Sequence, residues 1–145
     1  MKKAIAVLLL SALAATPALA RDTKYTLPFA EVLEMPEAKA QLDGSVRFYL
    51  AGQKTPPVVK RMGDDVSNKK TNGVGKQDET GCKWAALSTL LAFQEKAKRV
   101  GANAVIDIES YYKRDNFRSA TEYECHAGAV IIGVTLKGTF AKVAR

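Results

Sequence analysis

The stretch that decides this fold runs from Cys82 to Cys125 and reads CKWAALSTLLAFQEKAKRVGANAVIDIESYYKRDNFRSATEYEC. In residues 84–100 the apolar side chains recur at spacings of three and four, which is typical of an amphipathic helix. A turn at 101–103 follows, and residues 104–110 then alternate as a half-buried strand does. We therefore expect a helix that packs on a sheet.

The two ends of this stretch are the only cysteines of the chain, Cys82 and Cys125. In an exported protein such a pair most simply forms a disulfide, because an oxidising compartment permits it. Closing a loop of that length stabilises a fold by about 4 kcal/mol on the chain-entropy argument. The predicted fold class is α+β: one main helix on a small, mostly antiparallel sheet, with an N-terminal arm and one disulfide.

The first twenty residues have the features of a secretory signal peptide. Lys2 and Lys3 precede an apolar run at 4–15, and Ala18-Leu19-Ala20 has the small-x-small pattern of a cleavage site. The run is shorter than the roughly 20 residues that span a bilayer. The sequence thus predicts cleavage after Ala20 and a periplasmic or secreted protein without a membrane span. Since no cysteine stands at the cleavage point, we expect no lipid anchor.

The rest of the chain is short enough for a single core. Residues 21–44 are expected to form an N-terminal arm in which Pro36 interrupts a helical piece at 30–42. Residues 45–145 are expected to form one α+β domain, which opens with a strand at 45–50.

Two further segments are less regular. The polar segment 63–81 is predicted to be a long loop or a hairpin turned at Asn72-Gly73. Residues 122–137 are predicted to be strand, with a break at Gly138 before a last short strand at 139–143.

The charge of the chain is positive but dispersed. Removing Lys2 and Lys3 with the signal peptide lowers the formal net charge from +7 to +5. The cations are scattered rather than clustered on one face, so they favour a solvated surface over a nucleic-acid partner.

The order of these elements resembles a superfamily of small α+β domains. The similarity lies in Cys82, the run Lys98-Arg99-Val100-Gly101-Ala102-Asn103-Ala104-Val105, and Cys125 followed by Ala127-Gly128-Ala129-Val130. The superfamily contains the YbjQ-like putative heavy-metal-binding proteins and the periplasmic domain of the stress-sensing outer-membrane lipoprotein of the Rcs phosphorelay. The sensory lipoprotein has two disulfides and a lipid anchor, whereas this chain has one cysteine pair and no anchor site.

The segments Tyr111-Tyr112-Lys113 and 119–125 are most similar to small exported bacterial proteins that carry the label "excinuclease ATPase subunit". A nucleotide-binding phosphate loop needs Gly-x-x-x-x-Gly-Lys-Ser/Thr. Here Lys70 stands where the first glycine belongs, and Gln77 stands where the hydroxyl belongs. The residues therefore give no support to ATP hydrolysis.

Two sets of candidate site residues remain. Cys82, Cys125 and His126 could ligate a soft metal, but a disulfide is preferred, and His126 then points away from Cys125 to the surface. Tyr111, Tyr112 and Lys113 could form a stacking and cationic surface for a ligand or partner, or could be ordinary edge residues.

The carboxylates Asp107 and Glu109 are two apart on a strand and share a face, which suits cation binding or acid–base work but more often marks the solvated side of a sheet. With one histidine and paired cysteines, no nucleophilic triad is expected. The sequence therefore favours a non-enzymatic exported envelope module that binds a protein or cell-surface partner and needs no cofactor. A metal-binding protein is the alternative, and a hydrolase is the third.

Overall fold

The computed structural model describes residues 21–145. The predicted signal peptide, with its cleavage site, lies outside the described residues. The elements in chain order are β1 Thr23–Pro28, α1 Phe29–Leu33, α2 Pro36–Gln41, β2 Arg47–Leu50, β3 Val58–Asn72, α3 Asp78–Val100, β4 Ala104–Ser110, the 3-10 helix η1 Tyr112–Arg114, β5 Glu122–Ala127 and β6 Ile131–Val143.

The strands form one six-stranded sheet that is built around β6. β3 pairs along one edge of β6, while β4 and β5 pair in tandem along its other edge. β1 and β2 extend the sheet beyond β5 and β4, and only the β2–β4 pair is parallel. The predicted fold class, one main helix on a mostly antiparallel sheet, is confirmed.

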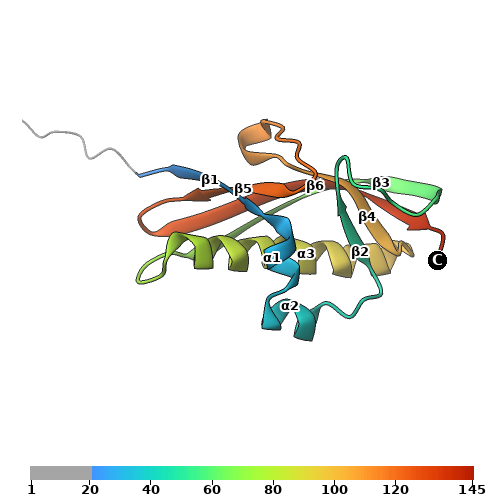
Figure 1. Cartoon of the computed structure of the whole chain (residues 1–145), viewed down its shortest axis with the longest axis horizontal. Helices are drawn as coiled ribbons and strands as arrows, with labels where there is room; N and C mark the ends of the chain where they lie inside the picture. Colours follow the sequence, from blue (N-terminus) through green and yellow to red (C-terminus); the bar gives the residue numbers. More distant parts are fainter. Residues whose placement is uncertain (1–20) are drawn as a thin grey trace, which may run out of the picture.

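Helix α3 covers one face of the sheet, called here the inner face (Figure 1). The apolar stripe predicted for residues 84–100 is the buried side, and Phe93 meets Phe140 of β6 edge to face with ring centroids 6.0 Å apart. The helix ends at Gly101, whose φ of 81° is the left-handed conformation that closes a helix at low cost.

The helix begins earlier than the apolar stripe predicts, and this brings Cys82 into its first two turns. Asp78 and Glu79 stand in the first turn, where carboxylates stabilise the positive end of a helix dipole. Cys82 and Cys125 of β5 are fully buried and are joined by a disulfide, with Cα atoms 5.8 Å apart. The predicted disulfide is confirmed, and it ties α3 to the sheet.

The N-terminal segment is more than an arm that docks on a finished domain. Residues 23–28 form β1, which pairs in register with all of β5. Pro36 does interrupt the helical piece, which splits into α1 and α2. Residues 21–44 thus complete one edge of the sheet and cover part of α3.

The expectation for residues 63–81 is wrong. The segment is neither a loop nor a hairpin: the 15-residue strand β3 extends through it as far as Asn72, and a short turn then leads into α3. The polar composition misled the sequence reading because most of β3 is exposed, so it lacks the apolar alternation of a half-buried strand.

The predicted break at Gly138 is also wrong, since β6 is continuous from Ile131 to Val143 and the chain turns at 128–130 instead. Gly138 serves packing: a Cβ atom there would lie 2.6 Å from Cγ1 of Val105. Within residues 21–145, no helix combines the length and apolarity that a membrane crossing requires.

Candidate functional site

The predicted residues Tyr111, Tyr112 and Lys113 lie in the connection that follows β4. This connection stands over the face of the sheet opposite α3, called here the outer face (Figure 1). The Tyr111 N–H donates to the carbonyl of Thr135 on β6 at 2.9 Å, which holds the connection against the sheet. Lys113 has a φ of 51°, so the chain turns sharply there.

The two tyrosines do not form one open platform. The Tyr112 ring stacks on His126 with centroids 3.5 Å apart and planes 13° apart, and the ammonium of Lys113 lies 5.4 Å from that ring. Tyr111 instead has the ammonium of Lys137 at 5.0 Å. Each ring already has a cationic or aromatic neighbour from the chain itself.

His126 lies on the outer face, opposite to Cys125, as the alternation of a strand requires. Its side chain is only 12% exposed, because it lies under Tyr112 and its two ring nitrogens face carboxylates of Asp22 and Glu124. The sequence reading placed this side chain on the surface and missed the covering ring.

This arrangement bears on the metal alternative. The sulfurs of Cys82 and Cys125 are bonded to each other in the core, and His126 faces away from them. Across residues 21–145, no group of three His, Cys, Asp or Glu side chains is arranged to hold a metal ion. Metal binding by these three residues would require the disulfide to open and the strand to rotate, and it stays a prediction.

Asp107 and Glu109 have separate partners. Asp107 lies at a bulge in β4 with a φ of 52°, and its carboxylate pairs with Arg61 at 3.0 Å. Glu109 is 9% exposed and accepts hydrogen bonds from Asn116 and Arg118. Each carboxylate is thus held by a different cation, which gives no support to their use as an acid–base pair.

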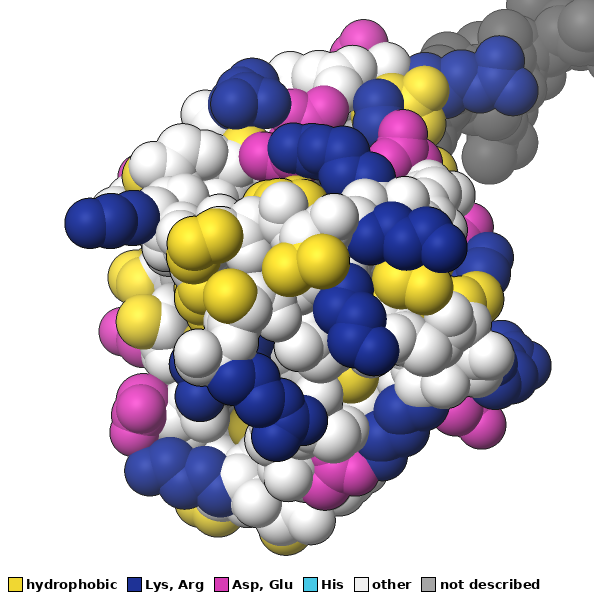
Figure 2. Space-filling view, turned by 90° about the vertical axis from the view of Figure 1, so that its right-hand side faces the viewer, with side chains coloured by type: hydrophobic (Ala, Val, Ile, Leu, Met, Phe, Trp, Pro, Cys, Tyr) yellow, Lys and Arg dark blue, Asp and Glu magenta, His cyan; other side chains and the backbone are white. Residues whose placement is uncertain are grey.

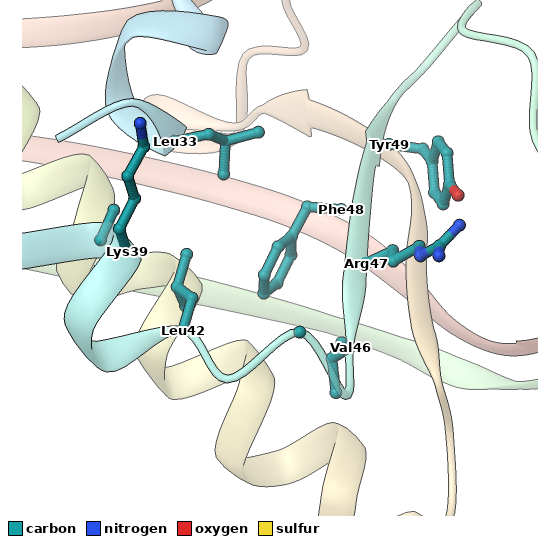
Figure 3. Close-up of a pocket in the computed structure, with 9 residues that line it drawn as sticks. Leu33, Lys39, Leu42, Val46, Arg47, Phe48 and Tyr49 are labelled. Carbon is teal, nitrogen blue, oxygen red and sulfur yellow. The ribbon is translucent and has the colours of Figure 1, made fainter. Parts of the chain in front are cut away.

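A hollow lies between β2 and the helices α1 and α2, and Figure 3 shows it. We call it the β2 groove; its volume is about 510 Å³. Its lining residues are Leu33, Ala38, Lys39, Leu42, Gly44, Val46, Arg47, Phe48 and Tyr49. Phe48 points toward Leu42, while Arg47 and Tyr49 point to the other side of the strand, so the floor of the groove is apolar (Figure 3).

A polar hollow of about 360 Å³ continues this groove, since both are lined by Gly44 and Arg47. It brings Arg47 close to Arg145 at the end of the chain. Its one acid, Asp43, is already bound by Lys98 and Ser45, which lower the pKa of that carboxyl. Figure 2 shows that Lys and Arg predominate over Asp and Glu on this end of the molecule. The groove therefore has an apolar floor and a cationic end.

The strand beside the groove is an edge of the sheet. β2 pairs only with β4 among the described strands. The N–H groups of Arg47 and Ala51 donate toward β4. Because backbone groups alternate in direction along a strand, the N–H groups of Phe48 and Leu50 point away from β4. The Leu50 N–H is taken by Gln53, which leaves Phe48 as the strand residue whose backbone faces the groove side unpaired.

Sequence reasoning missed this groove. Leu33 and Leu42 read as buried positions of the arm, and Phe48 reads as the buried side of a strand. In the structure all three pack only partly against the core, because α1, α2 and β2 meet without closing over them. Half-buried residues differ from buried ones by tertiary packing, for which the sequence carries no separate signal.

Comparison of this chain with protein-family models, with curated proteins and with solved structures finds no match. The resemblance described above therefore stays a prediction.

Proposed function

We propose that this chain is a non-enzymatic module that is exported to the cell envelope and binds a partner protein through an extended apolar segment held in the β2 groove. The observation that carries this proposal is the groove itself, an apolar hollow beside an unpaired edge strand. Ligand sites in proteins are commonly such hollows, lined by apolar side chains with a few polar groups at defined positions.

The geometry suits an extended peptide better than a compact molecule. Peptides often bind by adding a strand to a free sheet edge, where main-chain hydrogen bonds give affinity and pockets read alternate side chains. Here only Phe48 offers unpaired strand groups, so the apolar contacts to Leu33 and Leu42 supply most of the binding. Arg47 and Arg145 favour a segment that carries a carboxylate at one end.

The export signal and the disulfide support the envelope as the working compartment. The N-terminal sequence has the pattern of a secretory signal, and the disulfide is of the kind that an oxidising compartment sustains. The superfamily resemblance is consistent with an envelope role, although no comparison with known proteins supports that resemblance.

The test is selection of peptides from a displayed random library on the purified protein, followed by affinity measurement. We expect selected peptides to combine apolar residues with an acidic residue or a free carboxyl end. Their affinity should fall at least tenfold when Leu42→Asp places a charge in the groove. The matched control is Val130→Asp, because Val130 is an exposed valine at the distant β5–β6 turn. Equal binding by both variants, or no enrichment at all, would refute the proposal.

A further inference from the structure

Another edge of the sheet belongs to β3, and it differs from the β2 edge. β3 pairs only with β6 among the described strands. The backbone groups on the edge of β3 that points away from β6 therefore have no strand partner along its 15 residues. Long unpaired edges are templates for pairing with another strand. Lysines on an edge usually oppose such pairing, so the positions of the charges decide what this edge can accept.

The charges of β3 are spaced symmetrically about one residue. Asp64 and Asp65 lie on one side of Ser67, and Lys69 and Lys70 lie at the mirrored positions on the other side. All of them belong to the part of β3, residues 64–72, that pairs with β6 without interruption.

We propose that β3 pairs antiparallel with β3 of a second copy of this chain, about a two-fold axis that passes through Ser67. In a continuous antiparallel sheet, residues directly opposite each other share a face. The axis at Ser67 places Asp64 opposite the partner's Lys70 and Asp65 opposite the partner's Lys69. The symmetry repeats each contact, as an isologous interface requires.

Neighbouring registers lack this match. Within residues 64–72, a register centred on Val66 or on Asn68 sets no opposite charges face to face. A register centred on Lys69 places this lysine opposite the partner's Lys69. Opposite charges across a strand pair stabilise it, and like charges destabilise it. The charge pattern therefore selects one register.

A second observation is independent of the charges. Ser67 is 6% exposed, and its hydroxyl has no hydrogen-bond partner anywhere in the part of the chain that the structure describes. A buried unpaired hydroxyl is costly, so it calls for a partner. At the two-fold axis Ser67 would lie directly opposite the partner's Ser67, and a rotation about χ1 would bring the two hydroxyls, each now enclosed by its own chain, to the separation from which serine hydroxyls bond across strands.

The surroundings leave space for side chains of the added strand. A hollow of about 240 Å³ lies beside the centre of β3, between the strand and α3, and it is lined by Ser67 and Phe93 among others. On the outer face Val66 is 43% exposed, and an added strand would cover it. This interface is separate from the β2 groove and does not depend on the function proposed for it.

The test is a charge swap between two variants, Asp64→Lys and Lys70→Asp, measured by sedimentation equilibrium. Homodimers of the first variant would set lysine opposite lysine, and those of the second aspartate opposite aspartate. We expect each variant alone to dimerise about tenfold more weakly than the wild type. An equimolar mixture should regain wild-type affinity as a heterodimer, because every lysine then faces an aspartate. Recovery in the mixture also shows that both variants are folded.

The matched control is Lys60→Asp, a charge reversal on β3 outside residues 64–72 and therefore outside the proposed two-fold pairing. It should leave dimerisation unchanged. A wild-type chain that stays monomeric up to millimolar concentration, or a mixture no stronger than its components, would overturn the proposal. The groove variant Leu42→Asp should dimerise normally, so a failure here and a failure of the β2 groove are distinguishable.

Discussion

The two faces of the sheet are made by the same strands and are stabilised in different ways. On the inner face, β5 and β6 present Tyr123, Cys125 and Phe140 to α3, and these side chains are almost fully buried. On the outer face the same strands present Glu124 and His126, which are hydrogen-bonded to each other, and Lys137, which pairs with Glu109; the His126 ring also stacks on Tyr112. Apolar burial and a disulfide therefore stabilise one side, while the other has polar contacts with a short connection and a small apolar cluster of Ala104, Ile106, Ala141 and Val143.

The difference teaches where change is tolerated. Inner-face contacts are dry and close-packed, so each lost or added atom there has a cost. The outer-face pairs of Glu109 with Arg118 and Lys137 involve partly exposed cations and contribute little each. The two hollows that the proposals above use lie beside the edge strands β2 and β3.

The largest expected effect is loss of the disulfide. Replacing both cysteines, Cys82→Ser with Cys125→Ser, removes a cross-link between residues 43 apart in the sequence. The unfolded chain then gains conformational entropy, and the free energy of unfolding should fall by about 4 kcal/mol. Urea denaturation measures it. A reducing agent should destabilise the wild type by a similar amount and leave the variant unchanged. If reduction does not change the free energy of unfolding of the wild type, the disulfide does not stabilise the fold.

A smaller effect should separate two glycines of β6 that lie on opposite faces. In Gly138→Ala the new Cβ atom would lie 2.6 Å from Cγ1 of Val105 on the inner face, and the free energy of unfolding should fall by roughly 1–3 kcal/mol. In Gly133→Ala the nearest atom is Cγ of Lys70 at 3.5 Å, an ordinary contact. Thermal unfolding of both variants measures the difference, and equal losses would contradict the contrast between the faces.

The smallest effect concerns Asp78 in the first turn of α3 and depends on pH. Asp78 accepts hydrogen bonds from both Arg21 and the Tyr25 hydroxyl, which lower its pKa from 3.8 to about 2. A lowered carboxyl pKa stabilises the fold above the ordinary pKa, and the contribution is lost as pH falls toward the folded value.

Asp78→Asn should therefore unfold at a lower temperature than the wild type at pH 7, and the gap should close between about pH 4 and pH 2. Calorimetric scans across that range measure it. Asp115→Asn, which alters an exposed carboxylate in the connection on the outer face, is the control. A gap that persists at pH 2 would mean that Asp78 acts through packing rather than through its charge.

The strongest periodic patterns predicted their elements well. The stripe at 84–100 lies in α3, and residues 104–110 are β4 with the predicted bounds. The disulfide also followed from the cysteine count and the predicted compartment. These features depend on local spacing and on chemistry that any fold of this chain would share.

Weak patterns failed where the structure depends on distant partners. β3 has little apolar alternation, and it is a strand because β6 offers a full-length edge to pair with. Gly138 looks like a strand breaker by itself, but the close side chains of β4 give it a packing role. Tyr112 covers His126, although the two residues belong to separate segments and no local sequence pattern predicts their contact.

By itself the sequence determined the main helix, the β4 strand, the disulfide and the α+β class, because hydrophobic period and cysteine parity act through neighbours in the chain. Only the tertiary structure decided that β2 and β3 are free edges and that Leu33, Leu42 and Phe48 line a groove. The physical reason is that an edge strand, a hollow or an unpaired hydroxyl occurs where no distant segment of the chain packs, and the local spacing of residues does not encode this.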